Sequence, residues 1–177
     1  MSKLFLLFFL LTSSLFSKVI ISPYDAMKNV FVESDDVSKK NVLLTKSKAS
    51  YVQKTSKIKL GSKIFRTFKA SKNGTDGEIL LGYGILVSRN VRSKSAAILY
   101  MIDTTKTIKA VEIIAFNEPP EFIPNKKWMS QFENKQTKDN LFLGKAIPTI
   151  SGATLSARNV ADGSRIALAV ADLLFKK

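Results

Sequence analysis

The sequence Ile150-Ser151-Gly152-Ala153-Thr154-Leu155-Ser156 precedes the longest regular pattern in the chain. After it, apolar and small residues recur at helical spacing: Val160, Ala161, Ser164, Ala167, Leu168, Ala171, Leu174 and Phe175. A second stripe at intervals of three, four or seven is polar and consists of Arg158, Asp162, Arg165, Asp172 and Lys176. This two-faced pattern predicts a long C-terminal helix that begins after a flexible turn.

The start of this predicted helix has the features of a phosphate site. The first backbone N–H groups of a helix lack intrahelical partners and carry a partial positive charge, which favours an anion. The turn Ser151-Gly152-Ala153-Thr154 places a threonine hydroxyl beside these groups. We therefore consider phosphate capture at Thr154. The alternative is that a hydroxyl of the turn only caps the helix, which is the common role of Ser and Thr at such positions.

Length and charge limit the possible functions. The chain has 177 residues, 45% of them hydrophobic, which is typical of one globular domain with a real core. Lys and Arg number 28 against 14 acidic residues. The formal net charge of +14 predicts attraction to anionic partners such as phosphates, lipid head groups or acidic proteins.

Neither cysteine nor histidine occurs in the sequence. Their absence excludes thiolate-bound iron–sulfur clusters, Cys-attached haem, zinc sites built on Cys or His, and a Ser-His-Asp triad. We therefore predict neither a metal site nor catalytic residues. Any redox role then depends on an organic cofactor or on a partner.

Residues 1–17 have the three parts of a secretory signal peptide, namely a basic start, an apolar run at 4–11 and small residues before Ser17. The apolar run is shorter than the roughly 20 residues that a membrane span needs. We therefore predict an exported, periplasmic protein. The alternative is anchoring to the inner membrane by an uncleaved signal.

Residues 18–61 are predicted to form an N-terminal helical lead-in. It contains a short helix at 23–31, an acidic loop at 33–36 and a lysine-rich, solvated helix at 43–60. A nucleic-acid surface would combine basic residues with several stacking aromatic residues, and here only Tyr51 is present. We therefore predict no nucleic-acid partner.

Short β-rich segments separated by turn residues follow from residue 62 onward. Strands are predicted at 63–70, 78–87, 96–102 and 107–116, with hairpin connections at 73–77 and 103–106. Tight turns between successive strands indicate antiparallel pairing. Gly82 and Gly84 flank Tyr83 within the second strand, which indicates a bulge or the close approach of a ligand or another segment, or else ordinary packing. The fold class is therefore α+β, an antiparallel sheet with flanking helices.

Three prolines predict that residues 117–124 cross the surface as an extended segment. A short helix is expected at 126–133, where Trp128, Met129 and Phe132 form an aromatic stripe. Such a stripe either packs in the core or offers a surface to a flat ring such as a flavin. A polar linker at 134–140 leads toward the Ser-Gly-Ala-Thr turn.

Taken together, these features resemble the FMN-binding domain family, found in flavin subunits of sodium-pumping quinone reductases, in Rnf complexes and in small exported flavoproteins. The resemblance rests on the Ser-Gly-Ala-Thr turn with its helix, and on these further segments: Gly82-Tyr83-Gly84, Val111-Glu112-Ile113-Ile114, and Trp128 with Phe132 ahead of Gly144-Lys145. It covers residues 62–177, which we take as the domain.

In that family the threonine of the turn carries FMN through a phosphoester, which a Mg-dependent flavin transferase installs from FAD outside the cytoplasm. The resemblance implies this bond at Thr154 and a cofactor site that also includes Ser151, Gly152, Ala153, Ser156, Arg158, Gly82, Tyr83 and Trp128. The sequence departs from the motif at Pro148, where an acidic residue is common.

Three functions are consistent with the sequence. The first is an exported electron carrier with FMN on Thr154, matured by a flavin transferase and exchanging electrons with a membrane or periplasmic partner. The second is a cofactor-free basic module that binds an anionic membrane surface or an acidic protein. The third is a flavin-dependent enzyme, for which the sequence offers no evident acid or base.

Overall fold

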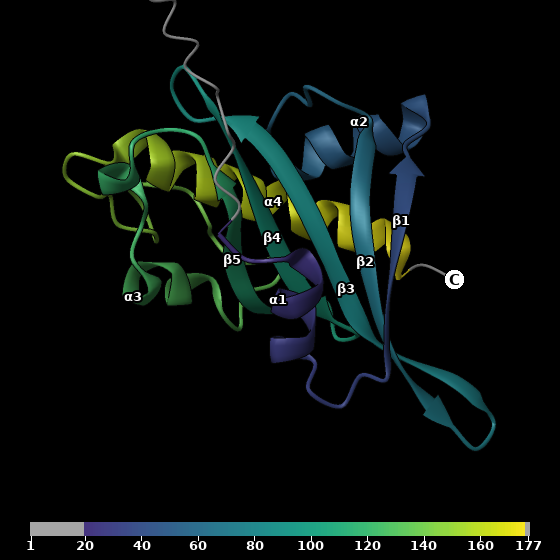
Figure 1. Ribbon diagram of the computed structural model, residues 1–177. Coiled ribbons are helices and arrows are strands. Elements are labelled where there is room, and N and C mark those ends of the chain that lie inside the picture. Colours follow the sequence, from purple (N-terminus) through teal and green to yellow (C-terminus); the bar gives the residue numbers. More distant parts are fainter. Residues whose placement is uncertain (1–19, 176–177) are drawn as a thin grey trace, which may run out of the picture.

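Five strands form one antiparallel sheet in a computed structural model that describes residues 20–175 (Figure 1). The strands lie in the order β1-β2-β3-β4-β5, so each pairs with its neighbours in the sequence. Their bounds are β1 Asp36–Leu43, β2 Ile64–Gly74, β3 Gly77–Asn90, β4 Ser95–Asp103 and β5 Ile108–Phe116. This arrangement confirms the predicted α+β class. The predicted signal peptide lies outside the described residues.

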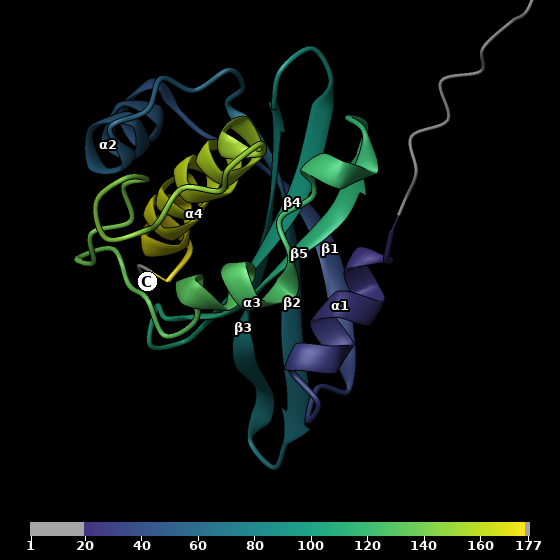
Figure 2. The same cartoon turned by 90° about the vertical axis from the view of Figure 1, so that its left-hand side faces the viewer.

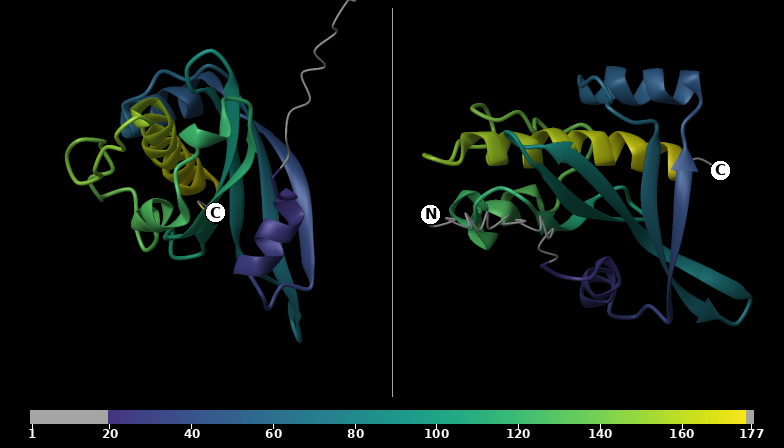
Figure 3. Two further views of the ribbon diagram at one scale, coloured as in Figure 1. Left: turned by 60° about the vertical axis from the view of Figure 1, so that its left-hand side comes forward. Right: turned by 45° about the horizontal axis from the view of Figure 1, so that its top comes forward.

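Helices cover both faces of the sheet (Figure 2). Helix α1, Pro23–Val30, lies on one face, and α4, Thr154–Leu174, crosses the other. Helix α2, Lys46–Ser56, packs on the side of α4 that faces away from the sheet (Figure 3). The remaining helical segments are α3, Lys126–Met129, and the single 3-10 turns Pro120–Phe122 and Ser130–Phe132. No helix within residues 20–175 combines the length and apolar character that a membrane crossing requires.

The alternation of side chains along the strands produces a hydrophobic core on each face. On the α1 face, Met27 and Phe31 pack against Phe68 and Met101. The larger core lies between the sheet and α4 and includes Tyr100, which is fully buried. Because α4 is enclosed by the sheet and α2, most of its predicted polar stripe is not fully open to solvent: Arg158 is exposed, but Asp162, Arg165 and Asp172 are only partly exposed.

Two glycines of β3 explain how α1 approaches the sheet so closely. A Cβ on Gly82 would lie 2.5 Å from the Phe31 ring, and one on Gly84 would overlap the sulfur of Met27. On the opposite face of the sheet, α4 approaches closely at Gly163, where a Cβ would overlap the Tyr100 hydroxyl. Packing of helices therefore accounts for the glycines that flank Tyr83.

The predicted strands are confirmed, but β1 was not anticipated. Its eight residues are mostly exposed and include Lys39 and Lys40, a pattern that lacks the alternation of an ordinary half-buried strand. Edge strands often carry lysine because it discourages pairing with other chains. Only pairing with β2, in which Val37 lies opposite Ala70, identifies the segment as a strand.

The predicted conformations of three segments need correction. The segment predicted as a solvated helix at 43–60 is helical only over Lys46–Ser56, and its Ala49 and Val52 are buried because it packs on α4. Residues 117–124 contain a 3-10 turn rather than an entirely extended segment, since a proline is tolerated at the first helical position. The helix expected at 126–133 divides into α3 and a 3-10 turn.

We expect Gly163→Ala to destabilise the protein by about 1–3 kcal/mol, because the added methyl group overlaps the Tyr100 hydroxyl in a closed core. Tyr100→Phe removes the 2.9 Å hydrogen bond to the Val160 carbonyl and should cost about 1 kcal/mol. Urea unfolding should show the double variant to be more stable than the sum of the single effects predicts. Gly61→Ala, in open space, serves as the control, and strict additivity of the two core substitutions would contradict the contact.

Candidate functional site

The Ser-Gly-Ala-Thr turn contains a backbone conformation that favours glycine. Gly152 adopts φ 78°, in the left-handed region that favours glycine. This conformation brings the Ala153 N–H to 3.2 Å from the Ile150 carbonyl. Ala153 is then the N-cap and Thr154 the first residue of α4. Ser151, Gly152 and Thr154 are exposed.

Helix α4 begins without a side-chain cap. The other three α-helices are capped by the oxygens of Ser22, Thr45 and Asn125. In contrast, the N-cap Ala153 has no side-chain oxygen, and the Thr154 hydroxyl donates backward to the Ile150 carbonyl at 3.1 Å. The turn is therefore not the ordinary hydroxyl cap that the sequence left open.

The first backbone donors of α4 remain available for a ligand. Among residues 20–175, no protein acceptor receives a hydrogen bond from the backbone N–H groups of residues 154–156. The first turn of α4 also contains no acidic residue that would neutralise the positive end of the helix dipole. Free donors and the dipole together favour an anion at this position.

A cavity of about 200 Å³ lies beside Thr154. Residues 152–156 form one wall, and the opposite wall comes from two other segments of the chain: Val91, Arg92, Glu118 and Phe122. Arg92 supplies a cation, while Val91, Phe122 and Leu155 supply apolar surface. The cavity thus offers separate places for a negatively charged group and for part of a flat, apolar ring.

Glu118 fixes the turn between β3 and β4 that carries Arg92. Its Oε1 accepts the backbone N–H groups of Lys94 at 2.7 Å, Ser93 at 2.8 Å and Arg92 at 3.2 Å. The Lys94 N–H is the largest contribution that lowers the pKa of Glu118, followed by those of Ser93 and Arg92, while partial burial acts in the opposite direction. The carboxylate therefore stays ionised and holds the wall of the cavity in place.

Trp128 does not line the cavity but supports the segment that leads to the Ser-Gly-Ala-Thr turn. Its side chain is buried and packs edge to face with Phe132 at 5.4 Å between ring centroids. The indole N–H donates to the Pro148 carbonyl at 3.0 Å. Pro148 occupies the position where the family motif commonly has an acidic residue, and here its backbone is tied to the core.

The structure separates the other predicted site residues into two groups. Ser156 is buried and lines the cavity, and Arg158 is exposed about one turn farther along α4. Tyr83 instead packs against Phe175, with ring centroids 5.1 Å apart. Phe175 follows the last residue of α4, a helix of 21 residues and therefore about 30 Å long. Tyr83 and the adjacent Gly82 are thus not brought to Thr154.

Sequence reasoning missed four residues of the cavity: Val91, Arg92, Glu118 and Phe122. They lie in the β3–β4 turn and in the segment after β5, where no motif marks them. A weak signal existed, because the turn at 91–94 holds two basic residues and Glu118 is a carboxylate next to two prolines. Only the pairing of β3, β4 and β5 shows that these segments meet the start of α4.

A larger cavity, of about 730 Å³, lies where the sheet divides. The pairing of β2 with β3 begins at Arg66 and Leu86, so the first residues of β2 and the last residues of β3 diverge. Lys59, Arg66 and Arg89 line this space, but none of the predicted site residues does. Within residues 20–175, no group of three or more Asp or Glu side chains is arranged to hold a metal ion.

Comparison with protein families identifies one match. Residues 94–169 match the family model of the FMN-binding domain. The matched segment contains β4, β5, the cavity residues Glu118 and Phe122, the Ser-Gly-Ala-Thr turn and most of α4. The match confirms the resemblance and FMN as the cofactor. A search of curated proteins gives no significant match.

The carboxylate of Glu118 should make the stability of the fold depend on pH. Since its pKa in the folded protein lies below the ordinary value of 4.5, the carboxylate stabilises the fold above pH 4.5, and this contribution is lost as the pH falls through the lowered pKa. We expect Glu118→Gln to be less stable than the unmodified chain in urea at pH 7, with a deficit that becomes smaller as the pH is lowered to 3. Glu121→Gln, which changes an exposed carboxylate three residues farther along the chain, is the control. A deficit that is the same at both pH values would contradict the proposed role of the charge.

Proposed function

We infer, from the FMN-binding domain that residues 94–169 form, that the chain is an exported electron carrier with FMN esterified to Thr154. One observation carries the inference: α4 begins uncapped, with an exposed threonine hydroxyl beside a cavity that has a cation and an apolar wall. A hydroxyl whose only function was to cap the helix would accept a hydrogen bond from the first turn. The Thr154 hydroxyl instead donates to the Ile150 carbonyl.

The residues present suit an FMN phosphate. The backbone N–H groups of residues 154–156 are available as donors. Arg92 lines the cavity and Arg158 lies about one helical turn beyond Thr154, so both would supply charge-assisted contacts. Val91, Phe122 and Leu155 provide apolar surface for one side of the isoalloxazine ring. Leu155 is 43% exposed and lines the cavity, so its side chain is accessible for a ring to cover.

Attachment to Thr154 would transfer the flavin phosphoryl group from the pyrophosphate anhydride of FAD to the threonine hydroxyl. The Thr154 oxygen forms a bond to the phosphorus on the flavin side of FAD, the pyrophosphate P–O bond breaks, AMP leaves and the hydroxyl proton passes to the transferase or to water. Exposure of Thr154 suits the access that a transferase needs. The esterified oxygen has no proton left to donate, so the hydrogen bond to the Ile150 carbonyl must be given up.

When bound, FMN supplies one- and two-electron redox chemistry that no side chain of this protein provides. The residues of the chain hold and orient it. Within the cavity, Glu118 is the only carboxylate, and its Oε1 holds the β3–β4 turn by accepting backbone N–H groups, which gives this residue a structural role. A carrier therefore fits this site better than an enzyme with its own substrate.

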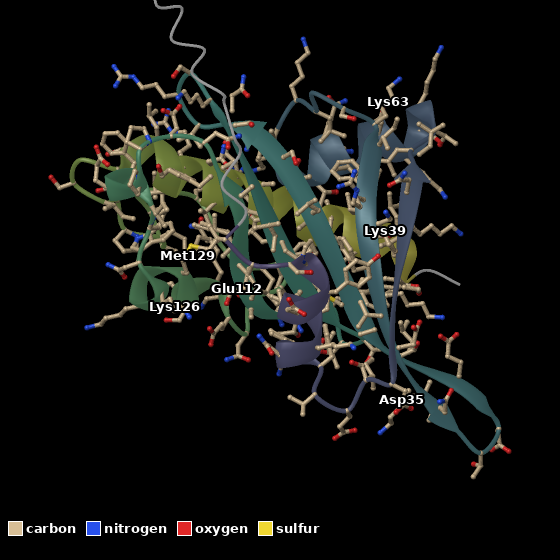
Figure 4. The ribbon with its side chains drawn as sticks, in the orientation of Figure 1. Asp35, Lys39, Lys63, Glu112, Lys126 and Met129 are labelled. Carbon is tan, nitrogen blue, oxygen red and sulfur yellow. The ribbon has the colours of Figure 1, made fainter. Side chains whose placement is uncertain are left out.

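Charge suggests how partners would approach. Lys39 and Lys63 lie on the β1–β2 side of the molecule and Lys126 lies on the opposite side, near α3 (Figure 4). Electron transfer slows steeply with distance, so we propose that an acidic redox partner docks around Thr154. The exposed lysines that would attract it are Lys94, in the turn that forms part of the cavity, and Lys126 and Lys127 of α3. The lysines of β1 and α2 would instead attract the protein to an anionic membrane surface after export directed by residues 1–17.

Co-expression with a flavin transferase should give the mature protein an added mass equal to FMN minus water. Thr154→Ala should remove this mass completely, because Ser156, the other hydroxyl residue in the first turn of α4, is buried. Thr149→Ala, in the same exposed loop, is the matched control and should keep the added mass. Intact-protein mass spectrometry makes the measurement, and an adduct that survives Thr154→Ala would disprove the phosphoester.

Electron exchange with an acidic redox protein, for example a [2Fe–2S] ferredoxin used as a probe, should slow as ionic strength rises, because salt screens the attraction. Replacing Lys94, Lys126 and Lys127 with Gln should slow exchange at low salt and flatten its salt dependence. The same change at Lys39, Lys40 and Lys63 alters the net charge equally and should have a smaller effect. Stopped-flow rates that do not depend on salt would contradict docking at the flavin site.

A further inference from the structure

Three cations surround the ring of Phe142 at a place remote from Thr154. The Arg165 guanidinium carbon lies 3.9 Å from the ring centroid, the Lys57 ammonium 5.5 Å and the Lys145 ammonium 5.8 Å. They come from the middle of α4, the end of α2 and the loop that precedes the Ser-Gly-Ala-Thr turn. Figure 3 shows α2 and α4 side by side, which is the packing that brings these segments together.

These cations line a cavity of about 380 Å³. Lys138 also lines it, so four cationic side chains share the cavity with one carboxylate, that of Asp139. This carboxylate is already engaged, because its Oδ2 accepts the Gln136 N–H at 2.7 Å. The side chains of Thr55 and Asn140 add neutral polar groups to the lining. The cavity is therefore strongly positive.

Arg165 is the fixed member of the cluster. Its Nη1 donates to the Ser56 carbonyl at 2.6 Å and its Nη2 to Asp162 at 2.5 Å. Asp162 also pairs with Arg89 at 3.1 Å, so its one negative charge is shared between two guanidinium groups. The Nε–H of Arg165 is buried and has no hydrogen-bond acceptor among the described residues.

The lysines have no such compensation. Among residues 20–175, Lys57, Lys138 and Lys145 form no ion pair. The distances to the Phe142 centroid place both Lys57 and Lys145 within about 10 Å of the Arg165 guanidinium, roughly the Debye length at 0.1 M salt. Attraction to the ring is worth only about 0.5–1 kcal/mol at exposed positions. Repulsion between the cations is therefore left largely unbalanced.

The backbone at Lys57 is also unusual. This residue ends α2 in the left-handed conformation, with φ 59° and ψ 34°, where glycine or asparagine is the common choice. A lysine at this position adds a third cation to the ring of Phe142 at some conformational cost. A role for its charge would explain the choice.

We propose that this cavity binds a phosphate group, as inorganic phosphate, a small phosphate monoester or the phosphomonoester head group of a lipid. A phosphate monoester carries a charge of about −1.5 to −2 at neutral pH and three strong acceptor oxygens, which match several converging N–H donors better than a carboxylate does. The site is separate from Thr154, because Arg165 lies 11 residues farther along α4, or about 16 Å. It does not depend on the proposed flavin attachment.

The test measures thermal unfolding of the full chain in chloride, acetate and phosphate buffers of equal pH and ionic strength. Phosphate should raise the midpoint in a saturable way, while acetate should have little effect. In the double variant Lys57→Gln, Lys145→Gln, half-maximal stabilisation should need at least about tenfold more phosphate, since two charge-assisted contacts are lost. The same variant should be at least as stable as the unmodified chain in chloride, because the repulsion is relieved.

Lys46→Gln with Lys48→Gln is the matched control, since it changes the net charge by the same amount at two exposed positions of α2 outside the cavity. It should retain the response to phosphate.

A second arm measures sedimentation with vesicles that contain phosphatidic acid or only neutral lipid. Binding that is specific to phosphatidic acid and lost in the Lys57, Lys145 variant, without a response to free phosphate, would assign the site to a lipid head group. An equal response of both double variants, or no response in either arm, would overturn the proposal.

Discussion

Helix α4 is enclosed between the sheet and α2, and the rest of the structure depends on this double burial. Small residues make it possible. Gly163 lets the helix approach the ring of Tyr100, whose hydroxyl donates to the Val160 carbonyl. On the opposite side, Arg165 reaches the backbone of α2 at Ser56. A helix held on two sides cannot slide or rotate without losing contacts in both layers, so its first residue is fixed in space. The position of Thr154 is a direct consequence.

The site at Thr154 contains two kinds of support. The sheet supplies the far wall, because the β3–β4 turn and the segment after β5 end beside the start of α4. Glu118 joins these two segments by accepting three backbone N–H groups, and Trp128 ties the approach to the turn through the Pro148 carbonyl. Glu118 and Trp128 therefore affect the shape of the site without contacting a cofactor. Each of them restricts the motion of a segment that would otherwise be a free loop, and a preorganised site loses less entropy when it binds a ligand.

The composition gives a net charge of +14 but does not show where the cations lie in the structure. Part of it lies on exposed lysines at both sides of the sheet, where salt screens it and where it would act on partners at long range. Another part converges on the ring of Phe142, where α2, α4 and the loop before the turn meet. Charges in a partly enclosed space act at short range. The exposed lysines and the cations around Phe142 are therefore suited to different ligands.

Local patterns in the sequence determined much of this protein. The 3.6-residue period gave α4, turn residues gave the hairpins of β2 to β5, and the Ser-Gly-Ala-Thr turn pointed to the threonine that the family match now supports as part of an FMN-binding domain. These features depend on residues close together in the chain. Strand β1 escaped prediction because an exposed, lysine-bearing edge strand is defined only by its partner. Likewise, the tertiary structure alone decided that Arg92 and Glu118 face Thr154, that Tyr83 lies at the far end of α4, and that distant cations meet over Phe142. Contacts between residues far apart in the chain are set by packing of whole elements, and no local pattern encodes that packing.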